Sequence, residues 1–142
     1  MTASFKVRPA RRGDADPIKG LLAEIGHSAD ASVVTWIISH PEMELWVAVD
    51  PLDKAIGVVA LSHRPMIRLA GRVATIDELV VTKAFRRQGV GRELVKRALE
   101  RAKVLGVKRI EIQSLGGADD PAVAFFRAQG FQDAGVLVFR QG

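Results

Sequence analysis

Apolar residues recur along this chain with two different periods, and the changes between them predict its elements. A repeat of three to four residues, clearest over 91–105, is typical of an amphipathic helix. Short runs rich in β-branched residues, such as 45–49, are typical of strands. The predicted strands are 4–7, 45–49, 55–62, 73–82, 107–114 and 131–140, and the predicted helices are 16–26, 30–40, 91–105 and 120–129.

The resulting element order is β-α-α-β-β-β-α-β-α-β, with a loop over 63–72 whose edges have room for short strand. We find no internal repeat, linker or low-complexity tract, and 142 residues suit one domain. We therefore expect a single domain over 1–142. Its fold class is α/β, in the α+β sense of a mixed sheet flanked by helices.

Composition excludes several kinds of chemistry. The chain has no cysteine, which rules out disulfides, thiolate nucleophiles and cysteine-based metal sites. His27, His40 and His63 lack metal-ligand spacing, so we expect no metal. No apolar run is long enough to span a membrane, and residues 1–12 have no hydrophobic signal core, so we expect a cytoplasmic protein without a membrane partner.

Positive charge is concentrated in the second half of the chain. Residues 1–71 carry 8 Lys/Arg and 8 Asp/Glu, whereas residues 72–142 carry 13 and 8. Over 83–97 six basic residues stand against the single acid Glu93. The stretch predicts a phosphate-bearing partner, the alternative being a solvated helix face. Phe85 is its only aromatic residue and no DNA-reading motif accompanies it, so we do not expect nucleic acid to be the partner.

The segment 79–91 places a basic, glycine-containing loop between a predicted buried strand and a helix. The first turn of a helix has backbone N–H groups without intrahelical partners, and the helix dipole adds positive potential there. Glycines at 89 and 91 let the backbone approach an anion closely. The loop lacks the Walker and dinucleotide-binding patterns, but it predicts phosphate binding.

The pattern Arg86-x-x-Gly89-x-Gly91 resembles the pyrophosphate loop of the GNAT N-acetyltransferase superfamily. Two further segments resemble that family: the strand 76–81 directly upstream, and 122–131, which is similar to the family's Ala-x-x-Phe/Leu-Tyr-x-x-x-Gly-Phe segment. The element order agrees as well, so the resemblance extends from Phe5 to Phe139.

The resemblance implies a sheet splayed between the strands at 76–82 and 108–114, with the pantetheine arm of acetyl-CoA in the gap. Main-chain groups of Leu79 and Val81 would bond the arm, and the N–H groups of 88–92 would bind the pyrophosphate. Asp119 stands where the family commonly has a pantetheine-contacting asparagine, although an N-cap role for it is the favoured alternative. The implied acetyl-CoA-binding residues are Leu79, Val80, Val81, Arg86, Arg87, Gln88, Gly89, Val90, Gly91, Arg92, Asp119 and Phe126.

Acetyl transfer to an amine needs a group that removes a proton from the ammonium form. The resemblance implies Asp77 or Glu78 as this base, and strand alternation predicts that only one of them faces the acceptor. The Leu79 N–H is the expected oxyanion donor. Phe126 matches a family tyrosine that serves as acid, and this chain has no tyrosine. Departure of the thiolate unaided, or protonation by Ser114 or water, remain as alternatives.

The predicted function is therefore an acetyl-CoA-dependent N-acetyltransferase acting on a primary amine of a small molecule or protein by direct attack on the thioester. The alternative is a catalytically silent acyl-CoA-binding module. The family's acceptor pocket corresponds here to roughly 26–44 and 62–72, which carry acids and bases alike, so the acceptor's charge stays open. A homodimer also stays open.

Overall fold

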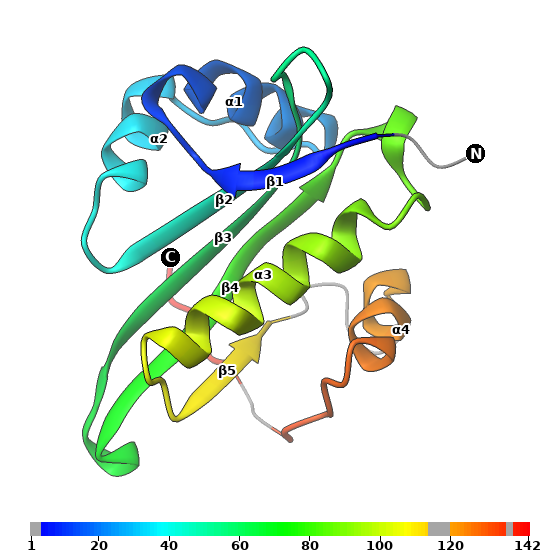
Figure 1. Cartoon of the computed structure of the whole chain (residues 1–142). Coiled ribbons are helices and arrows are strands. Elements are labelled where there is room, and N and C mark those ends of the chain that lie inside the picture. Colours follow the sequence, from blue (N-terminus) through cyan, green and yellow to red (C-terminus); the bar gives the residue numbers. More distant parts are fainter. Residues whose placement is uncertain (1–3, 114–119, 136–137) are drawn as a thin grey trace.

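The computed structural model describes residues 4–113, 120–135 and 138–142. Their strands form a five-stranded sheet in the order β1-β2-β3-β4-β5, in which neighbouring strands are antiparallel except for the parallel pair β4–β5 (Figure 1). The elements are β1 Lys6–Pro9, the 3₁₀ turn η1 Arg12–Asp14, α1 Ala15–Glu24, α2 Ala31–Ile38, β2 Met43–Val49, β3 Ala55–Met66, the 3₁₀ turn η2 Ile67–Leu69, β4 Gly71–Val81, the 3₁₀ turn η3 Lys83–Phe85, α3 Val90–Val104, β5 Arg109–Ile112 and α4 Pro121–Ala128.

Two apolar layers hold the sheet between its helices. On one face, Ile18 and Leu21 of α1 pack with Val58 of β3 in a cluster that also takes in α2. On the other face, Leu94 and Ala98 of α3 belong to a cluster with sheet residues from β2, β3 and β4. Because the central strands are covered on both faces, they are apolar almost throughout, as the run 56–61 shows. The expected mixed sheet with flanking helices is confirmed.

The segment expected as a loop over 63–72 is largely a hairpin. β3 continues to Met66, β4 begins at Gly71, and only the three-residue η2 and Ala70 separate them. Pairing persists to Met66 opposite Gly71. The pattern was hard to interpret because charged and apolar residues do not alternate regularly over 63–72.

The strand predicted over 131–140 is wrong for the residues that the structure describes there. Residues 131–135 and 138–140 belong to no strand. The Asp133 carboxylate accepts a hydrogen bond of 2.9 Å from the Gly135 backbone N–H, which is turn chemistry rather than ladder pairing. The Phe139 side chain is 89% exposed, so it does not belong to the apolar core.

Gly57 of β3 lies where α3 comes closest to the sheet. A Cβ at this position would be 3.1 Å from side-chain atoms of both Leu94 and Val90 and 3.2 Å from the Val80 carbonyl oxygen. The carbonyl belongs to a paired strand and cannot easily move away. We expect Gly57→Ala to lower the free energy of unfolding by about 1–3 kcal/mol, measured by chemical denaturation.

Gly20 gives the matched control, because a Cβ there meets nothing within 4 Å and the residue lies inside α1. Gly20→Ala should raise the free energy of unfolding by about 0.5–1 kcal/mol through helix propensity. Equal effects of the two substitutions would contradict the close approach of α3 to Gly57.

Candidate functional site

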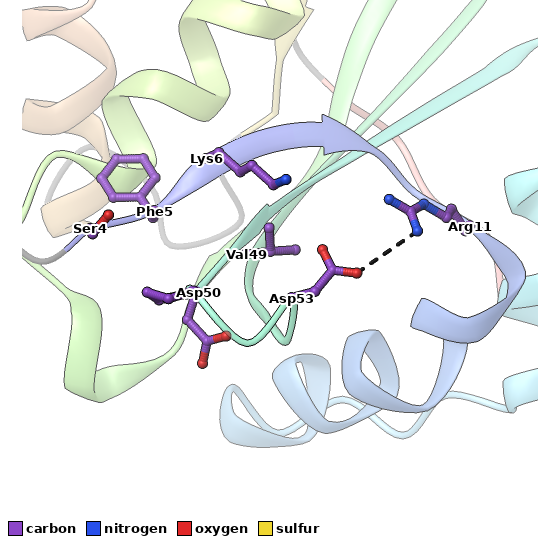
Figure 2. Close-up of a pocket in the computed structure, with 8 residues that line it drawn as sticks. Ser4, Phe5, Lys6, Arg11, Val49, Asp50 and Asp53 are labelled. Carbon is purple, nitrogen blue, oxygen red and sulfur yellow. Dashed lines mark ion pairs between the residues drawn. The ribbon is translucent and has the colours of Figure 1, made fainter.

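One surface pocket lies between the start of β1 and the β2–β3 turn (Figure 2). Its walls include Lys6, Arg11 and Asp53, and Arg11 and Asp53 form an ion pair of 3.8 Å across it. None of the residues predicted for the functional site lines this pocket. Charged side chains make up half of its lining.

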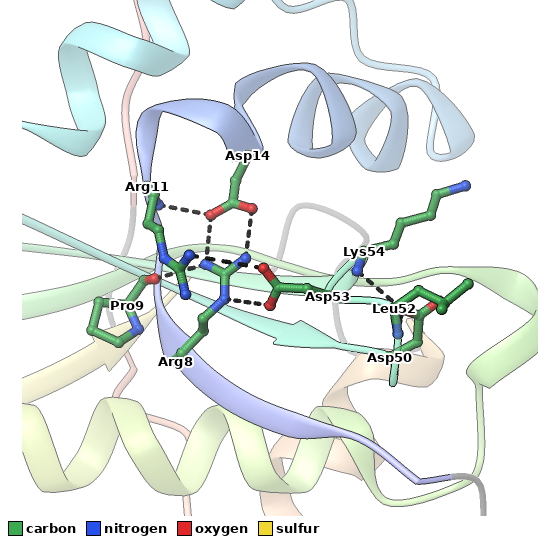
Figure 3. Close-up of polar contacts among 8 residues, drawn as sticks. All are labelled: Arg8, Pro9, Arg11, Asp14, Asp50, Leu52, Asp53 and Lys54. Carbon is green, nitrogen blue, oxygen red and sulfur yellow. Dashed lines mark hydrogen bonds and ion pairs between the residues drawn. The ribbon is translucent and has the colours of Figure 1, made fainter.

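Those charges form a structural network centred on Arg8 (Figure 3). Its guanidinium donates to both carboxylate oxygens of Asp14, over 2.7 and 2.9 Å, and to Asp53 over 3.0 Å. Burial alone would raise the pKa of the Asp14 carboxyl, but bonds from Arg8 and the Arg11 backbone outweigh burial and lower it. The network ties β1 to η1 and to the β2–β3 turn, and its donors and acceptors satisfy one another.

The second half of β4 presents an open edge. β5 pairs with β4 only from Val73 to Ile76, opposite Arg109–Ile112. On that side, residues 77–81 have no strand partner among the residues described. β5 ends at Ile112, opposite Ile76, so the gap expected between the strands at 76–82 and 108–114 would begin directly after Ile76.

One hydrogen bond shows toward which neighbour the backbone N–H and C=O groups of β4 point. The Thr82 N–H donates to the Ile56 carbonyl over 2.9 Å, so the backbone groups of Thr82 point toward β3. Because direction alternates along a strand, the main-chain groups of Leu79 and Val81 point toward the open edge, whereas those of Val80 point toward β3. The Val80 side chain is buried in the core beside α1. Leu79 and Val81 are thus the residues whose peptide groups an extended ligand could bond.

A β-bulge interrupts β4 at Asp77. Ala60 lies opposite Glu78 and Leu61 lies opposite Ile76, which leaves Asp77 as the extra residue. Ile76 and Leu79 both pack in the cluster beneath α3. The two residues between them, Asp77 and Glu78, are consequently turned to the same face, toward α1 and α2. The expectation that alternation would send the two carboxylates to opposite faces is wrong, because the bulge inserts one residue into the period.

The carboxyl groups of Asp77 and Glu78 both have raised pKa values. Asp77 is exposed by surface area, yet desolvation by the surrounding protein raises its pKa, and a hydrogen bond with Ser62 opposes the rise. The pKa of Glu78 is raised mainly by desolvation and further by the charge of Asp77, while the charge of His27 lowers it. Poised carboxyl groups of this kind are typical of proton-transfer sites.

The loop between η3 and α3 is shaped for an anion. Arg87 and Gly89 have positive φ values of 63° and 86°, and Gly89 is the N-cap of α3. Across the described part of the chain, no group accepts a hydrogen bond from the backbone N–H of any residue from 87 to 92. Six free donors before and within the first helical turn form a concave array that suits phosphate oxygens.

Three arginines surround this loop, and all are exposed: Arg86, Arg87 and Arg92. No carboxylate of the described residues forms an ion pair with them. Arg86 nevertheless has a partner, because its Nε donates to the Val81 carbonyl over 3.0 Å. That bond joins the open strand edge to the start of the loop. Gln88 is held by its side chain, which donates to the Ala84 carbonyl over 3.1 Å.

Glu24 holds the other side of the loop in place, a role that the sequence did not reveal. This residue ends α1, and its carboxylate accepts 2.7 Å and 3.1 Å hydrogen bonds from the Thr82 hydroxyl and the Lys83 N–H. Both bonds lower its pKa, that from Thr82 most. The partners are 58 and 59 residues apart in sequence, so no local pattern could have shown them. The same holds for Ser62 beside Asp77.

Aromatic residues of α4 close the site next to α3. Phe126 packs edge-on against Phe125 and Phe131, with ring centroids 5.4 and 6.1 Å apart. Phe125 sits so close to Gly91 that a Cβ there would be 3.4 Å from the ring. Asp120 is the N-cap of α4, and its carboxylate accepts a hydrogen bond from the Ala122 N–H over 2.9 Å. The predicted residues Asp119 and Ser114 lie outside the described residues.

The two segments expected to line an acceptor pocket, 26–44 and 62–72, differ in where they lie relative to Asp77 and Glu78. A depression next to the α1–α2 connection is lined by Lys19, Ala23, Gly26, His27, Ser28 and Ala29. It shares His27 with the surroundings of Glu78. The charged residues of the 62–72 segment instead lie along the β3–β4 hairpin, away from the carboxylates of Asp77 and Glu78. Glu42 and Glu44 are neutralised by Arg72 and Arg101, at 2.8 and 2.6 Å.

Within the ranges 4–113, 120–135 and 138–142, no three His, Asp or Glu side chains cluster as metal ligands. None of the helices described is long and apolar enough to cross a membrane.

Comparison with known proteins agrees with this geometry. The model of the acetyltransferase (GNAT) family matches residues 17–131. Peptidyl-lysine N-acetyltransferase YjaB of Escherichia coli is 33% identical over 95 residues, which cover 67% of this chain and 54% of that protein. An uncharacterized N-acetyltransferase of Methanocaldococcus jannaschii is 29% identical over 103 residues, covering 72% and 45%. The chain thus spans about half the length of these curated relatives.

The fold has close counterparts among solved structures. A Trypanosoma brucei acetyltransferase superposes with a TM-score of 0.83 at 16% identity, covering 97% of this chain and 99% of that one. At this identity the likeness concerns the fold alone.

The shared face of Asp77 and Glu78 predicts coupled titration. Since the Asp77 charge raises the pKa of Glu78, Asp77→Asn should lower the Glu78 pKa, measured by carboxyl ¹³C NMR. A raised carboxyl pKa means that the folded state holds its proton more tightly than the unfolded state, so stability falls as pH rises through the raised pKa. Asp77→Asn should therefore also reduce this loss of stability.

Asp16→Asn is the control, because Asp16 is exposed in the first turn of α1. It should leave the Glu78 titration unchanged. An unchanged Glu78 pKa in Asp77→Asn would show that the two carboxylates do not share a face.

Proposed function

The chain belongs to the acetyltransferase (GNAT) family, and from that membership we propose that it transfers the acetyl group of acetyl-CoA to a primary amine. The observation that carries the proposal is the continuity of two ligand-binding features. The open edge at Leu79 and Val81 leads, through the bond from Arg86 to the Val81 carbonyl, into the loop whose six N–H groups lack described partners. An extended arm ending in a pyrophosphate matches both features in that order.

Each part of the donor has a physical counterpart in this proposal. The pantetheine amides take the place of a neighbouring strand along Leu79 and Val81. The pyrophosphate accepts hydrogen bonds from the backbone of 87–92, and Arg87 and Arg92 add charge-assisted bonds. The helix dipole of α3 favours the same anion. Phe126 lines the adjoining side of the site from α4.

Glu78 is the proposed general base. Its carboxylate removes a proton from the acceptor ammonium, directly or through water, and the freed amine nitrogen attacks the thioester carbonyl carbon. The Leu79 N–H, on the open edge, donates to the carbonyl oxygen as it gains negative charge. A carbon–nitrogen bond forms and the carbon–sulfur bond breaks. The attacking nitrogen gives its second proton to water as the amide forms, and the first proton stays with Glu78 until solvent removes it.

Asp77 acts on this step through Glu78. Its charge raises the Glu78 pKa and makes that carboxylate a stronger base. With phenylalanine at 126, no phenol protonates the sulfur there, so the CoA thiolate leaves as the anion or takes a proton from water. A thiolate is a fairly good leaving group, and positioning of the two substrates supplies much of the rate.

The acceptor is a small-molecule amine or a protein amino group. The name of the Escherichia coli relative, a peptidyl-lysine acetyltransferase, favours a lysine side chain. The two carboxylates facing α1 and α2 also favour a cationic group. Acetyl-CoA and this amine are the only partners in the proposal.

Phe126 also motivates a second candidate, a module that binds acyl-CoA without catalysis. A thiol-release assay with acetyl-CoA and a panel of amines, including a lysine peptide, separates the two. The transferase releases thiol with at least one amine, whereas the silent module releases none. Both candidates predict that acetyl-CoA raises the melting temperature, increasingly with concentration. An unchanged melting curve at millimolar acetyl-CoA would contradict both.

A substitution at Gly89 tests whether the loop binds the pyrophosphate. Valine at this left-handed position strains the backbone and keeps an anion away from the N–H array, so Gly89→Val should raise the KM for acetyl-CoA by about tenfold or more with a smaller effect on kcat. Gly106 is a matched control, since it has φ 70° at the opposite end of α3. Gly106→Val should strain the backbone similarly and leave KM unchanged; a similar KM for both variants would remove the loop from the proposal.

Glu78→Gln should lower kcat by about 10²–10⁴-fold, the range for loss of a general base. Asp77→Asn should keep most of the rate and move the acid limb of the kcat/KM profile to lower pH, because the base then has a lower pKa. A large loss in Asp77→Asn with little effect of Glu78→Gln would reverse the two roles. If both variants keep the full rate, no base lies on this strand.

A further inference from the structure

The β3–β4 hairpin extends beyond the rest of the sheet. β3 and β4 have 12 and 11 residues, whereas β2 has 7 and the outer strands have 4 each. β2 pairs with β3 only as far as Ser62, and β5 begins pairing with β4 at Val73. Among the residues that the structure describes, those at 64–72 therefore have only one another as strand partners. Figure 1 shows this ribbon projecting past the end of α3.

The tip of this hairpin is an ordered turn. It consists of η2 and Ala70, which takes a left-handed conformation with φ 50° and donates to the Ile67 carbonyl over 3.0 Å. The turn leaves the Ile67 side chain 100% exposed. An isoleucine held entirely in water at the end of a projecting ribbon contributes nothing to the core.

The projecting part of the hairpin, 64–72, also carries basic residues and no acidic ones. No acidic residue occurs between Lys54 and Ile76. Arg64 and Arg68 are exposed, and no carboxylate in the described part of the chain pairs with either. Next to the turn, Lys108 lies against Gly71, where a Cβ would be 2.8 Å from its Cγ. Arg72 alone is neutralised, by Glu42.

We propose that the hairpin tip, defined as Arg64, Ile67 and Arg68, is a docking surface for an acidic segment of a partner protein that also carries apolar side chains. Charge complementarity identifies the occupant: two unpaired guanidinium groups flank one exposed aliphatic side chain. A second copy of this chain would bring like charges together. The tip has no aromatic or amide side chain for nucleic-acid bases, and its aliphatic residue has no counterpart on a phosphate backbone.

This surface is separate from the proposed active site. Arg64, a tip residue in β3, lies opposite Val73, which is five residues from Glu78 along β4, or roughly 16 Å at about 3.3 Å per residue; Ile67 and Arg68 lie beyond it. Docking at the tip therefore leaves the carboxylates and the anion-binding loop free, and the inference does not depend on the proposed acetyl transfer.

The test uses the full chain and a short fluorescein-labelled peptide of alternating glutamate and leucine, followed by fluorescence anisotropy at low salt. We expect saturable binding that Arg64→Gln/Arg68→Gln weakens by about tenfold or more and Ile67→Ser by several-fold. Arg12→Gln/Arg140→Gln removes the same charge from exposed positions elsewhere and should change the affinity less than about twofold. Melting curves confirm that each variant is folded.

Three results would overturn the proposal. Equal loss in both double variants would show that net charge alone binds the peptide. Tighter, Arg64- and Arg68-dependent binding of random duplex DNA would assign the tip to nucleic acid. A concentration-dependent dimer abolished by Ile67→Ser, with no binding of the peptide, would assign it to a second copy.

Discussion

The candidate site depends on one constraint, the need of every strand backbone to pair with something. Over residues 73–76 of β4 that need is met on both sides, by β3 and by β5. Past Ile76, among the described residues, a strand meets it on one side only, and the bulge at Asp77 marks the change. β5 ends opposite Ile76, so the peptide groups beyond it face no described strand, and peptide groups need hydrogen bonds. The open edge is thus suited to the proposed binding of an extended ligand, and side-chain identity at Leu79 and Val81 matters little to it.

The same bulge places the two carboxylates beside the proposed donor edge. A regular strand would hold Asp77 and Glu78 on opposite faces, one of them beneath α3 among apolar side chains. With one residue inserted, both carboxylates share the face of α1 and α2, close enough for one charge to influence the other. A single irregularity therefore sets both the proposed binding edge and the proposed base, and it fixes their separation more firmly than two independent loops could.

The residues that the sequence could reveal are those whose role is local. The position of the glycine-containing loop before a helix was predictable because Arg86 to Gly91 form one uninterrupted motif, and α3 because its apolar stripe is long. The bulge was not, since its only sign is a pairing with β3 residues fifteen to eighteen positions away. Glu24 and Ser62 act through contacts across the fold, which no spacing rule records. At 131–140 the alternation suggested a strand, but the turn chemistry of Asp133 and Gly135 prevailed.

Glu24 has a consequence for how the two halves of the site communicate. It ends the helix that leads into the acceptor-side connection, and it holds the first residues after β4, where the donor-side loop starts. A ligand that displaces either segment must work against the same two hydrogen bonds. In the proposed function, the binding free energies of the donor and the acceptor are then linked, and linkage is reciprocal: whatever the donor does to the affinity for the acceptor, the acceptor does equally to the affinity for the donor.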